Sequence, residues 1–495
     1  MGPGSGPQFR AGAWSTAGPG QGRLSRRGAL RSSVAAAAVA AAGPVLAACA
    51  GTKQAAGPTT AAKVILTIVW RPWYNFNNAT SKTGEALLLQ GIEPWLAQNP
   101  GINVEISFLG YQGTTVTALL AGNGPDIFAD WILPLYLSGN LLQDLTNFVK
   151  QDNVDLTIFS KLEMEFFQQE GGLWALPSYL HLECPAVNLG LLDNLGLTYP
   201  QPGWTYTDWT QLYQQTANKS TTASQRRVGG QFYWDGYDYY GSNPNACYLK
   251  GFGGDYVNPN DPTKCYLTNQ GSLDCFNWIY GLIQDGVCNS GGSNFVTGQI
   301  AASSADTAGG LITAAESWRS LKWQIYDEPL YPAGPVAYCA SDFYAISAAT
   351  PRPDVVWDFM KFLCVGPDWQ TWMMKLAMNG PNQKALYPQW VTTLKAIAPP
   401  LANIDLDVFN RQKQNDEPYI GLTFKYSDPQ AGAAINAATA PALTQKTTVP
   451  LALTQATQVV NALEASAASS VAAGLSAAKQ FPTNGRSMAT VVTGI

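Results

Sequence analysis

The chain has 495 residues, 34 of them acidic and 29 basic, and its formal net charge is −5 at pH 7. A negatively charged chain is a poor partner for nucleic acid or for an anionic membrane surface, so we expect neither. Hydrophobic residues make up 46% of the chain and charged residues only 13%, which allows large cores, and the length predicts two or more domains.

The first 48 residues have the composition of a cleaved export signal. They contain five arginines and no acidic residue, and the apolar run "AAAAVAAAGPVLAA" ends directly before Cys49. A basic region, a short apolar region and small residues at the end are typical of a signal peptide. The adjacent Arg26 and Arg27 resemble a twin-arginine export signal, although Ala29 stands where Phe or Leu usually follows, so general secretion remains an alternative.

The leader ends in "LAAC", which resembles the lipobox of bacterial lipoproteins. This resemblance implies that Cys49 is lipidated after cleavage and that residues 49–63, which are small and polar, form a flexible tether. We therefore expect an exported protein that is anchored only by lipid to the outer face of the cytoplasmic membrane, in a periplasm or at the cell surface.

Strand and helix patterns alternate along the next part of the chain. The run "VILTIVW" (64–70) is typical of a strand buried on both faces, a helix pattern covers 84–100, and a second strand pattern covers 102–110. A helix over 114–122 and a strand over 125–131 follow. This alternation predicts a parallel sheet with helices on its faces, in which ligands collect at the carboxyl ends of the strands.

That rule places six side chains on one rim: Trp70, Trp73, Tyr74, Tyr111, Asp130 and Trp131. Trp70 has an alternative role as the buried end of its strand. Asp126, inside the third strand pattern, is expected to be structural.

Seven cysteines follow Cys49, at positions 184, 247, 265, 275, 288, 339 and 364. No pair has the two-residue spacing of a zinc site or redox dithiol, so we expect no metal site. Export permits disulfides, and the four cysteines between 247 and 288 predict one or two bridges there, with the pairing left open.

An ordered series of motifs resembles the extracellular solute-binding proteins of ABC importers (family 1), which include maltose-binding and other sugar-binding proteins. The motifs are Pro125-Asp126, Leu141-Leu142, Trp174–Pro177, Leu195–Leu197, Trp204–Trp209, "GFGGDYVNP" (251–259), "FVTGQIAASSADTAG" (295–309) and "YAISAATPRPDVVWDFMKFLC" (344–364). Each motif is weak alone, but together they follow the family's order. Two departures are Val187-Asn188, where the family usually has Tyr-Asn, and Ser303, where it usually has Met.

The resemblance implies an α/β, two-lobe periplasmic-binding-protein-like fold of type II, with discontinuous lobes and a ligand cleft and hinge between them. We expect lobe I to comprise 64–178 and 331–378, and lobe II 179–330 and 379–465. A low-complexity tail would cover 466–495. Crossings between the lobes are expected near 177–182, 329–332 and 378–381, where prolines occur.

Catalysis is less well supported than binding. His181 is the only histidine, no "GxSxG" motif is present, and we expect no enzyme activity. A glycosidase remains the main alternative, because it needs only two carboxylates, such as Asp235 with Asp238 or Asp130 with Glu183. A binding protein for a solute other than a sugar is a further alternative.

Aromatic and acidic residues together favour a carbohydrate ligand, because aromatic rings stack on the C–H faces of a sugar and carboxylates bind its hydroxyls. The stretch "FYWDGYDYYG" (232–241) carries both types, with Phe232 and Tyr233 expected in the core. The further ligand-binding candidates are Tyr179, His181, Glu183, Trp234, Asp235, Tyr237, Asp238, Tyr240, Ser304, Asp306 and Thr307. Tyr179, His181 and Glu183 have hinge stabilisation as an equal alternative. The resemblance implies ABC permease subunits as partners, no cofactor, and a monomer.

Overall fold

The computed structural model describes residues 64–70, 82–108, 113–130, 133–137, 139–169, 171–218, 220–222, 225–232, 244–290, 295–306, 310–376, 380–415, 418–419, 421, 424–425 and 428–480. The strands are β1 Val64–Trp70, β2 Ile102–Phe108, β3 Ile127–Asp130, β4 Gln168–Gln169, β5 Gly172–Leu173, β6 Leu176–Asn188, β7 Gly230–Phe232, β8 Val257–Asn258, β9 Asp261–Cys265, β10 Cys288–Ser290, β11 Ala302–Asp306, β12 Trp323–Ile325, β13 Ala337–Ile346 and β14 Pro418–Tyr419.

The helices are α1 Lys82–Gln98, α2 Gly113–Leu120, α3 Leu133–Leu137, α4 Thr146–Asp152, α5 Lys161–Phe167, α6 Leu189–Leu195, α7 Tyr206–Thr216, α8 Pro244–Gly251, α9 Gln270–Gln284, α10 Gly310–Ser317, α11 Pro353–Cys364, α12 Pro367–Leu376, α13 Tyr387–Ile397, α14 Asp407–Gln414, α15 Asp428–Leu443 and α16 Val449–Gln480. None of these helices is both long and apolar enough to cross a membrane.

The first half of the main sheet confirms the predicted alternation. β1 pairs in parallel with β2 and with β3, and α1 and α2 connect them along the chain. Leu66 and the last three residues of β1 are buried, whereas burial along the whole strand was expected. Because β13 pairs antiparallel with β3, the complete sheet is mixed, not wholly parallel.

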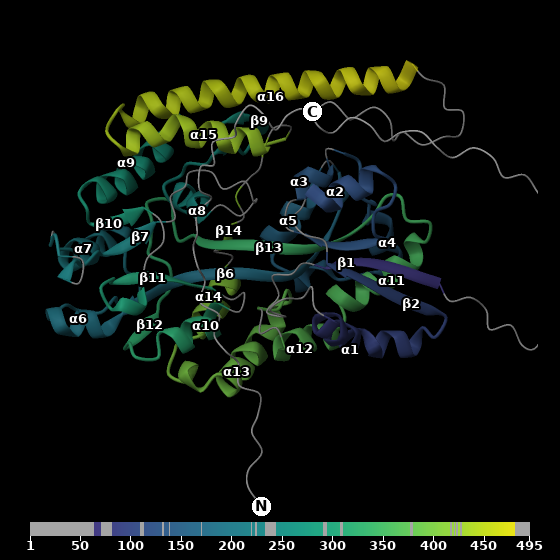
Figure 1. Ribbon diagram of the computed structural model, residues 1–495, viewed down its shortest axis with the longest axis horizontal. Helices are drawn as coiled ribbons and strands as arrows, with labels where there is room; N and C mark the ends of the chain where they lie inside the picture. Colours follow the sequence, from purple (N-terminus) through teal and green to yellow (C-terminus); the bar gives the residue numbers. More distant parts are fainter. Residues whose placement is uncertain are drawn as a thin grey trace, which may run out of the picture. The chain divides into compact units, whose positions relative to one another are not determined.

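Two long strands, β6 and β13, lie side by side in the middle of the main sheet (Figure 1). The strand order is β11-β6-β13-β3-β1-β2, with β12 also paired to β6 and β14 to β13. The segment beside residues 177–182 is therefore part of β13. Near the other two expected crossings, Leu330 bridges Thr205 and Pro381 bridges Tyr179 of β6.

Two separate hydrophobic cores support the two-lobe reading. Leu182 of β6 and Cys339 of β13 belong to the first core, which also contains β1–β3. Val187 and Tyr338, on the same two strands, belong to the second core, which contains α7, α9, α15 and α16. The two long strands therefore pass from one core to the other.

The cores do not divide the chain at every expected lobe boundary. Side chains of α13 and α14 pack in the first core, although residues 379–465 were expected in lobe II. The tail expected from residue 466 begins inside α16, which continues as a helix to Gln480.

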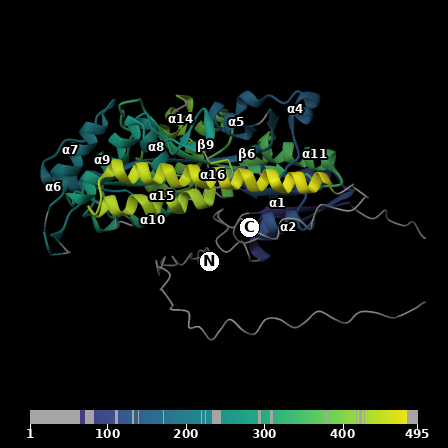
Figure 2. The same ribbon diagram turned by 90° about the horizontal axis from the view of Figure 1, so that it is seen from above.

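The last two helices form a hairpin whose contact surface is rich in alanine. Figures 1 and 2 show α15 and α16 lying side by side. Small buried side chains at helical spacing allow the two backbones to approach closely. They include Ala431, Ala438 and Ala442 on α15 and Ala452 and Ala456 on α16.

The seven described cysteines contradict the disulfide prediction. All are buried as thiols, and none forms a disulfide. They lie on seven different helices and strands, and Cys275 and Cys364 point into different cores. Close spacing in the sequence was therefore a poor guide to pairing, because each cysteine acts as a small core side chain.

Candidate functional site

The strongest candidate site lies on one face of the β6–β13 pair. Tyr179, His181 and Glu183 alternate along β6, so they share a face of the sheet. The Nε2 atom of His181 lies 3.7 Å from Oε1 of Glu183, and their side chains are 23% and 25% exposed. This half-buried position keeps both groups within reach of a ligand while limiting competition from water.

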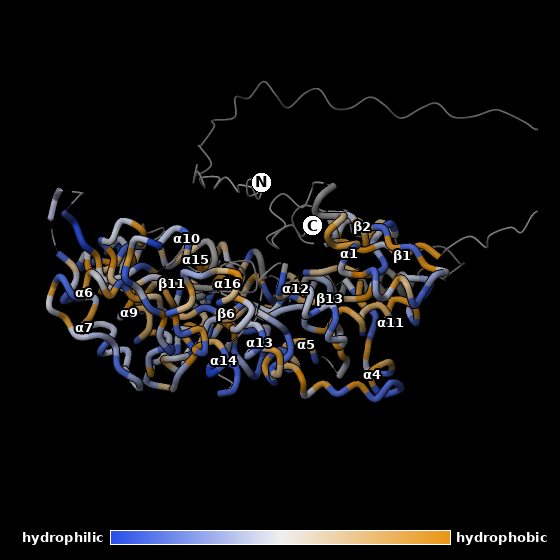
Figure 3. The backbone as a smooth tube through the Cα atoms, turned by 90° about the horizontal axis from the view of Figure 1, so that it is seen from below, coloured by the Kyte–Doolittle hydropathy of each residue, from blue (hydrophilic) through white to orange (hydrophobic). Residues whose placement is uncertain are grey.

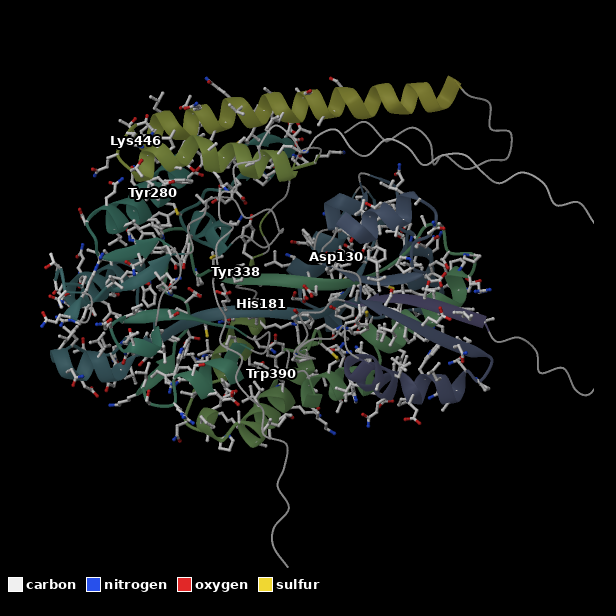
Figure 4. All side chains as sticks on the ribbon, in the orientation of Figure 1. Asp130, His181, Tyr280, Tyr338, Trp390 and Lys446 are labelled. Atoms are coloured by element: carbon white, nitrogen blue, oxygen red, sulfur yellow. The ribbon has the colours of Figure 1, made fainter. Side chains whose placement is uncertain are left out.

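Strand β13 adds Tyr338 and Asp342, two residues that were not predicted from the sequence. Asp342 is paired in register with Tyr179, and Ala340 with His181. The ring of Tyr338 packs edge-on against His181 with 5.7 Å between centroids, and Figure 4 shows the two side chains close together. Alternation along 337–346 was the available signal, but only the strand register brings these residues to His181.

Strand β11 borders β6 on its other side. Asp306 is paired in register with Glu183, and Ser304 with Pro185. The backbone pairing thus brings Ser304 and Asp306 beside the second half of β6. Thr307 lies outside the described residues.

Two of the residues expected on the rim of β1–β3 are buried. Trp70 is only 1% exposed and packs against Tyr344 and Trp369, so its alternative role as a core residue matches its burial. Asp130 is also buried, at the end of β3, and accepts a hydrogen bond from the Tyr136 hydroxyl. Trp73, Tyr74, Tyr111 and Trp131 lie outside the described residues.

Asp126 is structural, as predicted. Its Oδ2 accepts hydrogen bonds from the backbone N–H of Thr67 at 2.8 Å and from the Thr67 hydroxyl at 3.0 Å. Its Oδ1 accepts one from the Thr350 hydroxyl at 2.6 Å. This carboxylate therefore fastens β1 to the turn after β13.

The aromatic stretch at 232–241 is described only at its start. Phe232 is buried at the end of β7 and packs against Tyr213, Tyr248 and Trp278, which confirms its predicted core position. Tyr233, Trp234, Asp235, Tyr237, Asp238 and Tyr240 lie outside the described residues.

No metal chemistry emerges from the part of the chain that the structure describes. Nowhere in those residues do three His, Cys, Asp or Glu side chains gather closely enough to hold a metal ion. The candidate face instead combines an imidazole, carboxylates and tyrosine rings, which can bind and orient a polar ligand without a bound ion.

Residues 79–364 match the family model described as bacterial extracellular solute-binding protein. The chain belongs to this family. No curated protein sequence matches this solute-binding protein.

Three solved structures show a similar fold. An ABC substrate-binding protein from Listeria monocytogenes in complex with cycloalternan has 16% identity and a TM-score of 0.64, covering 81% of this chain and 99% of that one. The cyclic alpha-maltosyl-1,6-maltose binding protein from Arthrobacter globiformis has 17% identity and a TM-score of 0.65, with 81% and 99% covered.

An ABC transporter solute-binding protein from Thermotoga lettingae bound with alpha-D-tagatose has 14% identity and a TM-score of 0.61, covering 81% of this chain and 100% of that one. These similarities establish the fold of the solute-binding protein as the two-lobe α/β fold of type II periplasmic binding proteins. They confirm the fold class expected from the sequence.

Proposed function

We propose that this solute-binding protein captures a carbohydrate between its two lobes and delivers it to the permease subunits of an ABC importer. The observation that carries the proposal is the polar and aromatic face of β6 and β13, where both strands pass from one core to the other. A ligand bound there contacts the region that must bend when lobes close. Three structural neighbours are described with carbohydrate ligands or as carbohydrate-binding proteins, which supports this ligand class.

The residue types on this face suit a sugar. His181 and Glu183, which are 23% and 25% exposed, supply hydrogen-bonding groups for its hydroxyls, and the largely buried rings of Tyr179 and Tyr338 border them with apolar surface. Asp342 adds a buried carboxylate beside Tyr179. In this proposal the remaining contacts come from the sequence candidates Trp73, Tyr74, Tyr111, Asp130, Trp131, Trp234, Asp235, Tyr237, Asp238, Tyr240, Ser304, Asp306 and Thr307.

The proposal also includes the form of the mature protein. It is a monomer without a cofactor, held to the outer face of the membrane by lipid on Cys49. Its lobes follow the boundaries expected from the sequence except at α13 and α14, whose side chains belong to the first core. Metabolic labelling with a fatty-acid analogue, with Cys49→Ala as control, tests the anchor, and loss of label only in the variant is expected.

Ligand titration tests the function directly. The mature chain without its lipid would be titrated with maltotetraose, α-D-tagatose and a panel of other mono- and oligosaccharides, with intrinsic tryptophan fluorescence and melting temperature as readouts. A true ligand at about 100 times its Kd stabilises the folded state by about 2.7 kcal/mol. The carbohydrate assignment fails if no member of the panel gives a saturable signal.

Binding without turnover separates this proposal from a glycosidase. The family and its structural neighbours are substrate-binding proteins. We expect no release of chromophore from nitrophenyl glycosides of the sugars that bind. Hydrolysis that disappears in Asp235→Asn would favour the enzyme instead.

A further inference from the structure

A fully buried ion pair lies behind the candidate face. Nζ of Lys413, on α14, lies 3.7 Å from Oε2 of Glu163, on α5, and their side chains are 0% and 1% exposed. Two charges removed from water in this way are tolerated only when their other hydrogen-bonding positions are also satisfied.

Both charged groups have further partners. Glu163 accepts hydrogen bonds from the Ser160 hydroxyl at 2.6 Å and the Ser341 hydroxyl at 2.9 Å. Lys413 donates to the carbonyl oxygen of Asn382 at 2.9 Å and lies 4.9 Å from the centre of the Tyr387 ring. Burial lowers the pKa of Lys413, and the nearby Glu163 carboxylate opposes that change. Hydrogen bonds from neighbouring groups therefore offset part of the cost of burying the two charges.

The same network holds the backbone of β6. Asn382 donates from Nδ2 to the Pro177 carbonyl at 2.7 Å, and Gln370 donates from Nε2 to the Ser178 carbonyl at 3.2 Å. Gln412, the neighbour of Lys413, donates to the Glu183 carbonyl at 3.3 Å. The strand segment that carries Tyr179, His181 and Glu183 is thus fastened at both ends.

Strand β13 is connected to the ion pair by the side chain of Ser341. Ser341, which donates to Glu163, lies between Ala340 and Asp342, the residues paired with His181 and Tyr179. Alternate residues of a strand point to opposite faces, so Ser341 points away from the candidate face while Asp342 points toward it. The ion pair and its hydrogen-bonding partners therefore contact β6 and β13 on the side opposite the candidate face.

Helix α14 also connects to the second core. Arg411 donates from Nε and one terminal nitrogen to the two carboxylate oxygens of Asp327 at 2.9 and 3.0 Å. The Asp327 carbonyl accepts a hydrogen bond from the indole of Trp204, a second-core residue, at 2.8 Å. Figures 2 and 3 both place α14 and α5 on the same side of β6. Helix α14 thus reaches α5 with Lys413 and the second core with Arg411.

We infer that the Glu163–Lys413 pair is the fixed point about which the two lobes turn when ligand is captured. The inference rests on the proposed function in one respect, that capture closes the lobes. Separating the pair would leave uncompensated buried charges, so closure changes backbone torsions around the pair and leaves the contact intact. Glu163 and Lys413 are positioning residues, because they touch the backs of the strands and not the ligand.

The adjacent turn of α5 provides a matched control. Lys161 and Glu165 also lie 3.7 Å apart, but their side chains are 74% and 56% exposed. The variant pair Glu163→Gln/Lys413→Met removes the buried charges with little change in volume. Lys161→Met/Glu165→Gln makes the same chemical change on the surface of the same helix.

The distance between lobes is the decisive readout. Spin labels would be placed on cysteines substituted for the exposed Lys150 of α4 and Asp285 after α9, because the seven native cysteines are buried. In the ligand-free protein we expect the distance distribution of the buried-pair variant to become about twice as wide, because the lobes gain directions of motion. The surface-pair control keeps the width of the parent protein.

Unchanged width in the buried-pair variant, even with a lower melting temperature, overturns the inference and leaves the pair a purely structural contact. If the double variant does not fold, Ser341→Ala replaces it, because this change removes only one hydrogen bond to Glu163. We then expect the distance distribution to widen by a smaller amount. With a sugar identified by titration, the buried-pair variant should bind about tenfold more weakly, because a smaller fraction is competent to close. The ligand-free measurement stands by itself, so a failure of the sugar proposal is distinguishable from a failure of the fixed point.

Discussion

Asp255 offers a direct test of how burial controls the stability of this protein. Its side chain belongs to the "GFGGD" motif, is 3% exposed, and accepts hydrogen bonds from the Tyr419 hydroxyl and from the Tyr256 N–H, the latter at 2.7 Å. Burial raises the pKa of Asp255 from 3.8 to about 6, although the hydrogen bond from Tyr419 partly opposes the rise. The folded state therefore holds this proton to a higher pH than the unfolded chain does.

The size and sign of the effect follow from that difference. A change from 3.8 to about 6 corresponds to about 3 kcal/mol, since each pKa unit is worth about 1.4 kcal/mol. Below pH 4 both states are protonated and the residue has no effect. Between about pH 4 and about 6 the unfolded chain loses this proton while the folded state keeps it, so the free energy of unfolding falls progressively and levels off above about 6.

The assay is urea unfolding of the parent protein and of Asp255→Asn between pH 4 and 8. Asn keeps an acceptor for Tyr419 but cannot ionise, so we expect the variant to gain up to about 3 kcal/mol relative to the parent across this range. Asp285→Asn, at an exposed position, controls for general charge effects. A stability difference between parent and Asp255→Asn that stays flat with pH would refute the reasoning.

Three other outcomes are expected. Gly271→Ala should destabilise the protein by about 1–3 kcal/mol in urea unfolding, because the added methyl carbon would lie 2.7 Å from the backbone nitrogen of Gly254. Gly281→Ala, in the same helix, has open space around the new methyl group and should stabilise the protein by up to about 1 kcal/mol. Equal urea midpoints for the two variants would contradict this. His181→Asn should weaken sugar binding about tenfold, as loss of one good hydrogen bond does, with little change in melting temperature, and unchanged affinity would remove His181 from the site. A thiol reagent should find none of the seven cysteines accessible in the native mature protein and all seven after denaturation, and fewer than seven would indicate a disulfide.

Local patterns predicted the first part of the fold well. The strands β1–β3 and helices α1 and α2 lie within a few residues of the predicted ranges, because hydrophobic periodicity reports directly on local structure. Tyr179, His181 and Glu183 were candidates only because they lie at an expected crossing, and the strand β6 places them on one face.

Contacts between distant segments were harder to predict. Tyr338 and Asp342 reach the candidate face only through the register of β13 against β6. The sequence left the role of Trp70 open, because a position at the end of a strand fits both a rim and a core. Its ring packs against Trp369, which matches the core role. The buried Glu163–Lys413 pair gave no local signal, since neither residue differs from a surface charge until the helices pack.

The buried thiols have a consequence for the lifetime of the protein outside the cytoplasm. Burial raises the pKa of Cys247, Cys275, Cys339 and Cys364 well above the usual value, so the reactive thiolate is scarce while the chain is folded. Unfolding restores ordinary thiol reactivity in a compartment that favours oxidation, where incorrect disulfides would block return to the native state. Survival there depends on how rarely the chain unfolds, so the unfolding rate, more than the equilibrium stability, sets its durability.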